Sequence, residues 1–143
     1  MSAQIGNRIR VFLADDHPLV CQGITSLLTA EGIEVCGEGG SSESILAHPR
    51  LPTARVVILD LSLDKRQGNG TDLIFALRRR GLLVVICSMN EDAGAVRRAF
   101  AAGATGYVTK REAGSTLIHA LAAVLDGKTY ASPRAAEALG QDP

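Results

Sequence analysis

The sequence contains few aromatic residues and no excess of charge of either sign. Tryptophan is absent, aromatic residues make up 3% of the chain, and 15 Lys and Arg balance 15 Asp and Glu. Sites for single-stranded nucleic acid usually stack bases on aromatic rings, and DNA-binding domains usually carry a basic face. The composition therefore indicates neither a single-stranded nucleic-acid site nor a DNA-binding domain. The dense basic run Arg78-Arg79-Arg80 precedes Gly81, where a helix is expected to end, so its cations complement the helix dipole.

Long hydrophobic runs and paired cysteines are also missing. No apolar run approaches the roughly 20 residues that span a bilayer, and residues 1–8 lack the apolar core of a signal peptide. We therefore expect a cytoplasmic protein with no membrane partner. The three cysteines show no Cys-x-x-Cys spacing, which argues against a zinc site or a disulfide framework.

What the sequence does contain is a regular alternation of strand-like and helix-like segments. Apolar segments typical of buried parallel strands occur at residues 9–14, 33–37, 55–59, 82–87 and 105–108. Helical patterns follow at 18–30, from Ser41 to near Pro49, at 71–80, from Asn90 or Asp92 to Gly103, and around 117–125. This (βα)5 alternation predicts a flavodoxin-like α/β fold, a doubly wound five-stranded parallel sheet with strand order 2-1-3-4-5.

The length and hydrophobic content fit a single domain. With 143 residues, 46% of them hydrophobic, the chain can bury one sizeable core. We expect residues 1–8 to form an N-terminal tail, residues 9–127 the folded domain, and residues 128–143 a linker-like C-terminal segment. Within that last segment, residues 134–139 are expected to make one or two helical turns.

Polar and charged side chains lie at the ends of four of the predicted strands. Asp15 and Asp16 follow the first strand, Asp60 ends the third, Ser88 follows the fourth, and Lys110 follows the fifth. The functional crevice of an open α/β sheet lies at the carboxyl ends of its strands, so these side chains should converge. Three carboxylates in one site repel each other unless a cation joins them. The pattern therefore predicts a metal site.

These positions, together with three longer segments, resemble the receiver domain of two-component response regulators. The segments are 14–20 (ADDHPLV), 103–110 (GATGYVTK) and 127–132 (GKTYAS), and they are most similar to the LuxR/NarL-type transcription regulators. The resemblance covers about residues 9–127. It implies a module that changes conformation on phosphorylation and so controls an output, which in this group is DNA-binding transcription regulation by the parent protein.

The resemblance also implies the chemistry of the site. Asp60 would be the phosphoacceptor and would take the phosphoryl group from a sensor histidine kinase in the presence of Mg²⁺. Asp16 and Asp60 would bind Mg²⁺ through their carboxylates, Ser62 through its backbone carbonyl, and Asp15 through a bound water. In-line phosphoryl transfer depends more on positioning and charge neutralisation than on the reactivity of the nucleophile, so a carboxylate suffices.

A conformational switch is implied at Ser88 and Tyr107. Lys110 would pair with Asp60 and then with a phosphoryl oxygen, while the Ser88 hydroxyl would donate a hydrogen bond to a second phosphoryl oxygen. The movement of Ser88 would drag the loop after the fourth strand, and Tyr107 would rotate inward. A charge-assisted hydrogen bond contributes about 1.5–3 kcal/mol, enough to shift a population between two conformers. The output would be an altered surface of the fourth helix, fifth strand and fifth helix, or a homodimer through the first and fifth helices.

The sequence departs from the family pattern in several places. Residues 63–70 (LDKRQGNG) form a lengthened loop with Asp64 where a proline is usual, and Arg111 replaces a proline after Lys110, so no cis peptide is expected there. His17 has no partner histidine, so packing at the helix start is the expected role of its ring. LuxR/NarL-type regulators contact DNA through a C-terminal helix-turn-helix domain, and we expect this output domain to be absent from this chain.

Two alternative functions compete with the phosphoacceptor hypothesis. An aspartyl-nucleophile phosphohydrolase would need a second carboxylate two residues beyond the nucleophile, where this chain has Ser62. We therefore expect a phosphoacceptor and not a turnover enzyme. A stand-alone or phosphorylation-independent interaction module stays open as the second alternative. A nucleotide site is disfavoured because no Gly-rich loop follows the first strand.

Overall fold

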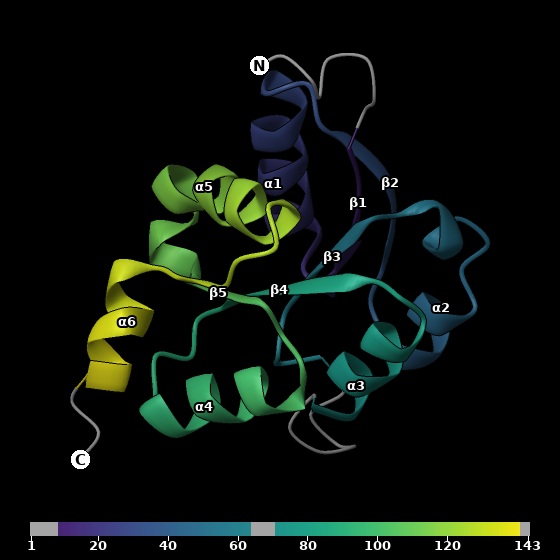
Figure 1. Cartoon of the computed structure of the whole chain (residues 1–143). Coiled ribbons are helices and arrows are strands. Elements are labelled where there is room, and N and C mark those ends of the chain that lie inside the picture. The colour runs from purple at the N-terminus through teal and green to yellow at the C-terminus, as the bar shows by residue number, and fades with distance from the viewer. Residues whose placement is uncertain (1–8, 64–70, 141–143) are drawn as a thin grey trace.

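The computed structural model describes residues 9–63 and 71–140. A parallel sheet runs through the middle of the molecule, with helices on both of its faces (Figure 1). Its strands are β1 (Arg10–Ala14), β2 (Glu34–Gly39), β3 (Val56–Leu59), β4 (Leu83–Ser88), β5 (Gly106–Thr109) and β6 (Tyr130–Ala131). Their order is β2-β1-β3-β4-β5-β6, and every neighbouring pair is parallel. The predicted α/β class and the order of the first five strands are confirmed.

Capping residues in the sequence mark the start of two of the helices and the end of one of them. The helices are α1 (Pro18–Ala30), α2 (Ser42–Leu46), α3 (Thr71–Arg79), α4 (Ala93–Ala102), α5 (Ala113–Leu125) and α6 (Pro133–Gly140), with 3₁₀ turns η1 (Leu51–Thr53) and η3 (Lys110–Glu112). Ser41 caps α2 in a capping box, and the Asp92 carboxylate accepts from the Ala95 N–H at the start of α4. Gly103 ends α4 at φ 117°, a left-handed conformation that favours glycine.

Each face of the sheet is covered by its own hydrophobic core. On one face α2, α3 and α4 pack against alternate strand residues, with Ile45, Leu77 and Val96 fully buried. On the other face α1 and α5 do the same through Leu28 and Leu117. Because β3 is buried on both faces, all four of its residues are apolar. This two-sided packing fixes the strand ends that carry the polar side chains.

Within the predicted linker-like segment, residues 128–140 pack against the rest of the domain, and the helical turns expected at 134–139 are present as α6. Tyr130 and Ser132 donate their N–H groups to the carbonyls of Thr105 and Tyr107, both at 2.9 Å, so β6 extends the sheet beside β5. Helix α6 follows and contacts α4 and β5, and Ala135 is fully buried. A strand of two residues has no periodicity to read, which is why the sequence pattern missed it.

Part of the predicted organisation lies outside the described residues. Residues 1–8, 64–70 and 141–143 are not described, and with them the predicted N-terminal tail and most of the predicted loop 63–70. The first described strand, β1, begins at Arg10. Across the described ranges, every helix is too short or too polar to cross a bilayer.

Candidate functional site

The polar residues at the strand ends meet at one edge of the sheet. Ala14 pairs with Leu59 in the parallel register of β1 and β3, and the Asp60 N–H donates to the Ala14 carbonyl at 2.9 Å. Asp15 and Asp60 therefore leave neighbouring strands side by side. On the other flank, Ser88 pairs with Thr109, and Lys110 is the next residue. The convergence follows from the strand order alone.

Asp60 is the most deeply buried carboxylate of the group. Its side chain is only 2% exposed. One oxygen, Oδ1, accepts from the Ser62 N–H at 3.1 Å, while Oδ2 accepts from the Ser62 hydroxyl at 2.7 Å and from Lys110 Nζ at 3.1 Å. A buried carboxylate is tolerated only when it is paired and hydrogen-bonded. These partners meet that need and fix the orientation of the carboxylate.

Lys110 is the cation that joins two of the carboxylates. Its Nζ lies 3.1 Å from Asp60 Oδ2 and 3.1 Å from Asp15 Oδ2. Burial of the ammonium would lower its pKa, but the hydrogen bonds and charges of Asp15 and Asp60 outweigh that effect and raise the pKa above its usual value. Lys110 therefore stays charged and offsets part of the negative charge of the site.

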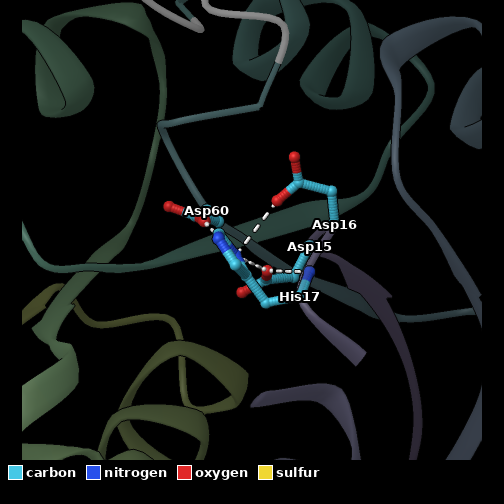
Figure 2. Close-up of side chains that lie close together, drawn as sticks. All are labelled: Asp15, Asp16, His17 and Asp60. Atoms are coloured by element: carbon cyan, nitrogen blue, oxygen red, sulfur yellow. Dashed lines mark hydrogen bonds and ion pairs between the residues drawn. The ribbon is translucent and has the colours of Figure 1, made fainter. Parts of the chain in front are cut away.

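His17 lies inside the acidic group, where sequence reasoning did not place it. Its Nδ1 lies 2.8 Å from Asp15 Oδ1, 3.0 Å from Asp16 Oδ1 and 3.7 Å from Asp60 Oδ2 (Figure 2). The ring was expected to pack at the start of the helix. His17 is indeed the residue before α1, but its extended backbone (φ −106°, ψ 105°) turns the ring toward the carboxylates.

The four side chains form a group that can hold a metal ion. Asp15, Asp16, His17 and Asp60 each offer one ligand atom, and these atoms all lie within 4.8 Å of one another. Hard divalent cations such as Mg²⁺ prefer carboxylate oxygens, so the donor set fits the implied metal. The Ser62 carbonyl stays a predicted ligand, since the contacts seen for Ser62 are those of its N–H and hydroxyl with Asp60.

Ser88 and Tyr107 are linked through Asn90. The buried Ser88 Oγ accepts from the Asn90 N–H at 3.0 Å, and the Tyr107 hydroxyl donates to the Asn90 carbonyl at 2.6 Å. Tyr107 is fully buried, and this burial raises its pKa to about 12. The predicted inward rotation would start from an outward ring, whereas here the ring is already inside. The sequence marked Asn90 only as a possible start of the fourth helix.

A cavity of about 690 Å³ opens beside Asp60. Its wall includes the site residues Ser62, Ser88 and Lys110 and, from α3 and α4, Thr71 and Arg98. The small residues Ala95 and Ala99 leave this room on the side of α4. A reacting group of modest size can therefore reach Asp60 from solvent even though the carboxylate itself is buried.

Comparisons with known proteins agree with this geometry. Residues 11–122 match the model of the response regulator receiver domain. The DNA-binding transcriptional activator DevR/DosR of Mycobacterium tuberculosis is 38% identical over 136 residues, covering 92% of this chain and 61% of that protein. The chain thus spans about three fifths of the length of curated relatives that it matches.

Solved structures show the same fold. A two-component response regulator of the LuxR family from Aurantimonas sp. superposes with a TM-score of 0.85 at 29% identity, covering 94% of this chain and 97% of that one. The isolated receiver domain of RcsB from Salmonella enterica serovar Typhimurium, determined in the presence of the phosphomimetic BeF3⁻, gives 0.81 at 32% identity, covering 93% and 99%. Sequence, fold and strand-end side chains agree, and the chain belongs to the response regulator receiver domain family.

Proposed function

We propose that Asp60 is the phosphoacceptor of this receiver domain. The observation that carries this proposal is the position of Asp60: its side chain is 2% exposed, it is hydrogen-bonded to Ser62 and Lys110, and it still borders the 690 Å³ cavity. A carboxylate held this way is oriented for in-line attack and partly neutralised. Those two conditions govern phosphoryl transfer more than intrinsic nucleophilicity does.

The transfer forms one bond and breaks one. An Asp60 carboxylate oxygen forms a bond to phosphorus as the bond between phosphorus and the donor breaks, and the electron pair leaves with the donor. With a phosphohistidine of a sensor kinase, the P–N bond breaks and the imidazole departs. With a small acyl phosphate, the P–O bond breaks and the carboxylate departs. Lys110, already 3.1 Å from Asp60 Oδ2, can move to a phosphoryl oxygen without crossing the site.

The metal of this site is proposed to be Mg²⁺. Asp16 and Asp60 would bind it through carboxylate oxygens, Ser62 through its backbone carbonyl, and Asp15 through a water. A bound Mg²⁺ would neutralise the charge that develops on the transferring phosphoryl group. Asp16 is half-exposed, so its carboxylate can bind the ion directly from solvent, whereas the Asp60 carboxylate is buried.

We propose that Asn90 belongs to the switch together with Ser88 and Tyr107. The Asn90 N–H is bound to Ser88 and its carbonyl to Tyr107. When Ser88 turns its hydroxyl toward a phosphoryl oxygen, the bond to the Asn90 N–H is lost, and the turn that holds Tyr107 changes with it. The buried Tyr107 would therefore be released or reset by this event, in place of the inward rotation expected from the sequence.

The parent protein is proposed to regulate transcription. Curated relatives are named as transcriptional regulators, and RcsB has been solved as a complex with DNA. For this chain we propose a receiver domain reaching from residue 9 through the β5–α5 unit, with β6 and α6 leading toward a DNA-binding output domain. A sensor histidine kinase would be the phosphodonor, and phosphorylation would favour a homodimer.

We propose that the chain is a phosphoacceptor and not a turnover enzyme. Turnover would need an acid/base carboxylate two residues beyond Asp60. Ser62 stands there instead, and its hydroxyl donates to Asp60 Oδ2 at 2.7 Å. A hydroxyl held in that bond has no acid/base role near neutral pH.

Incubation with acetyl phosphate and Mg²⁺ tests the proposal. The chain should gain the mass of one phosphoryl group, stable in acid and removed by hydroxylamine, as an acyl phosphate requires. Asp60→Asn should abolish the modification, whereas Asp126→Asn, an exposed aspartate paired with Lys128 at the surface, should keep it. Equal phosphorylation of the Asp60→Asn variant would remove Asp60 from the mechanism.

A further inference from the structure

His17 brings a nitrogen donor into a group that otherwise offers only oxygens. Its Nδ1 faces three different carboxylates, at 2.8, 3.0 and 3.7 Å (Figure 2). The three aspartates come from the ends of two neighbouring strands, and His17 comes from the start of α1. This donor set, three carboxylates and one imidazole, is not one that a site for Mg²⁺ alone requires.

The separations between these atoms match the edges of one coordination shell. In an octahedral shell with ligands about 2.1 Å from the ion, two ligands at right angles are about 3.0 Å apart and two opposite ligands about 4.2 Å apart. The distances from His17 Nδ1 to Asp16 Oδ1 and Asp60 Oδ2, 3.0 and 3.7 Å, fall within that range, and the 2.8 Å distance to Asp15 Oδ1 is that of a hydrogen bond. A single ion can therefore contact Nδ1 and the carboxylates of Asp16 and Asp60 with small adjustments of side chains, while Asp15 binds it through a water.

The backbone keeps the imidazole in this place. The His17 N–H donates to Asp15 Oδ1 at 2.9 Å, the same oxygen that Nδ1 approaches. Pro18, the first residue of α1, restricts His17 to an extended conformation. The His17 side chain is 56% exposed, and that of Asp16 is 48% exposed, so ions from solvent can reach both.

We infer that His17 is a protein ligand of the metal, through Nδ1, and that its imidazole strengthens the binding of a first-row transition-metal ion such as Mn²⁺ more than that of Mg²⁺. Imidazole is a good ligand for transition metals, whereas Mg²⁺ prefers an all-oxygen shell. The inference rests on the metal site of the proposed function. It adds a ligand and a metal class to that site.

The contribution of His17 to metal affinity can be measured by Mn²⁺ titration, in which electron paramagnetic resonance monitors the loss of the free-ion signal. Loss of a group that merely orients a ligand lowers metal affinity roughly 10–100-fold, so His17→Ala should weaken Mn²⁺ binding at least about tenfold. Mg²⁺, measured by its competition with Mn²⁺, should change much less. His119→Ala, which removes an exposed imidazole on α5, is the matched control and should change neither affinity.

A spectroscopic readout tests ligation itself. Electron spin echo modulation of the bound Mn²⁺ should show ¹⁴N coupling from an imidazole in the original chain and in His119→Ala, and none in His17→Ala. Absence of that coupling from the original chain would overturn the inference. Tighter Mn²⁺ binding by His17→Ala would overturn it too, because it would show that the ring competes with the ion for the carboxylates.

These outcomes are separable from failure of the proposed function. Asp16→Asn removes a carboxylate from the group and should weaken Mn²⁺ and Mg²⁺ together. If Mn²⁺ and Mg²⁺ both bind outside the acidic group, Asp16→Asn will change neither, and the metal site itself is wrong. If Asp16→Asn weakens both ions but His17→Ala weakens neither, the metal site stands and the role of His17 is wrong.

Discussion

At the scale of single residues, the site is a balance of charge around Asp60. Two buried carboxylates, Asp15 and Asp60, share one ammonium group, that of Lys110, at 3.1 Å from each. Because the folded pKa of Lys110 is raised, its contribution to stability is fully present below its ordinary pKa of about 10.4. That contribution is lost only as the pH rises through the folded pKa. Near neutral pH the Lys110 ammonium therefore stays charged and offsets part of the negative charge of Asp15 and Asp60.

Burial of Tyr107 makes the unfolding free energy of the domain depend on alkaline pH. Its pKa is raised from about 10 to about 12 by burial, so the folded state resists ionisation of the phenol. The resulting stability is present below pH 10 and is lost as the pH rises through 12. Replacement of Tyr107 by Phe should cost about 1 kcal/mol near neutral pH through loss of the bond to Asn90. The same change should make the decline in unfolding free energy between pH 9 and 11 shallower.

Urea unfolding at a series of pH values, followed by circular dichroism, measures both effects. The second tyrosine, Tyr130, lies on β6 and supplies the control variant Tyr130→Phe. An equal alkaline decline in the original chain and in Tyr107→Phe would mean that Tyr107 does not contribute to the pH dependence.

At the scale of secondary-structure elements, a hydrogen-bonded link joins the site to the C-terminal helix. Glu112 in η3 accepts from the Thr109 hydroxyl at 2.7 Å and from the Arg134 N–H at 2.9 Å. The fully buried Ser132 accepts from the Thr109 N–H at 3.2 Å. Thr109 precedes Lys110, so α6 is held by the residues next to the cation of the site.

The pKa of Glu112 determines how this hydrogen-bonded link responds to acid. Burial would raise its pKa, but hydrogen bonds with Ser132, Thr109 and the Arg134 backbone outweigh that effect and lower the pKa. The stabilisation is therefore present above the ordinary pKa of about 4.3 and is lost as the pH falls through the lower folded value. We expect α6 to detach as the pH falls below about 4, before the sheet unfolds.

Amide signals of residues 133–140, followed by NMR during acid titration, check this expectation. Glu112→Gln should loosen α6 already at neutral pH, because its side chain can no longer accept from both Thr109 and Arg134. Glu137→Gln, an exposed change on α6 itself, is the matched control and should leave the acid response unaltered. Acid detachment that persists unchanged in Glu112→Gln would contradict the role of this carboxylate.

At the scale of the whole molecule, the sheet explains which parts of the site the sequence could predict. Asp15, Asp16, Asp60, Ser88 and Lys110 were predictable because each follows an apolar strand, and a parallel sheet brings strand ends to one edge. Their hydrogen bonds were not, since those depend on rotamers. The direction of the His17 ring depends on the backbone angles before Pro18, and no periodic pattern encodes them.

The same reasoning explains what was missed at the C-terminus. The helical turns expected at residues 134–139 are present as α6, but strand β6 has only two residues and leaves no recognisable hydrophobic pattern. Their position is set by contacts with Thr109 and Glu112, which are distant in sequence. Tertiary contacts of this kind are invisible to a local pattern.

Metal binding should stabilise the whole domain, because only the folded chain brings Asp15, Asp16 and Asp60 together. A ligand specific to the folded state adds about 2.7 kcal/mol at a free concentration 100 times its dissociation constant. Saturating Mg²⁺ should therefore raise the thermal midpoint, and chelation should reverse the shift.

Asp16→Asn should remove most of the shift, and its own fold should survive because the Asp16 side chain is 48% exposed. Asp126→Asn should keep the full shift. The Mg²⁺-free samples should be matched in ionic strength with NaCl, so that the shift reports binding and not charge screening. A shift of the same size in Asp16→Asn would place the stabilising ion elsewhere on the molecule.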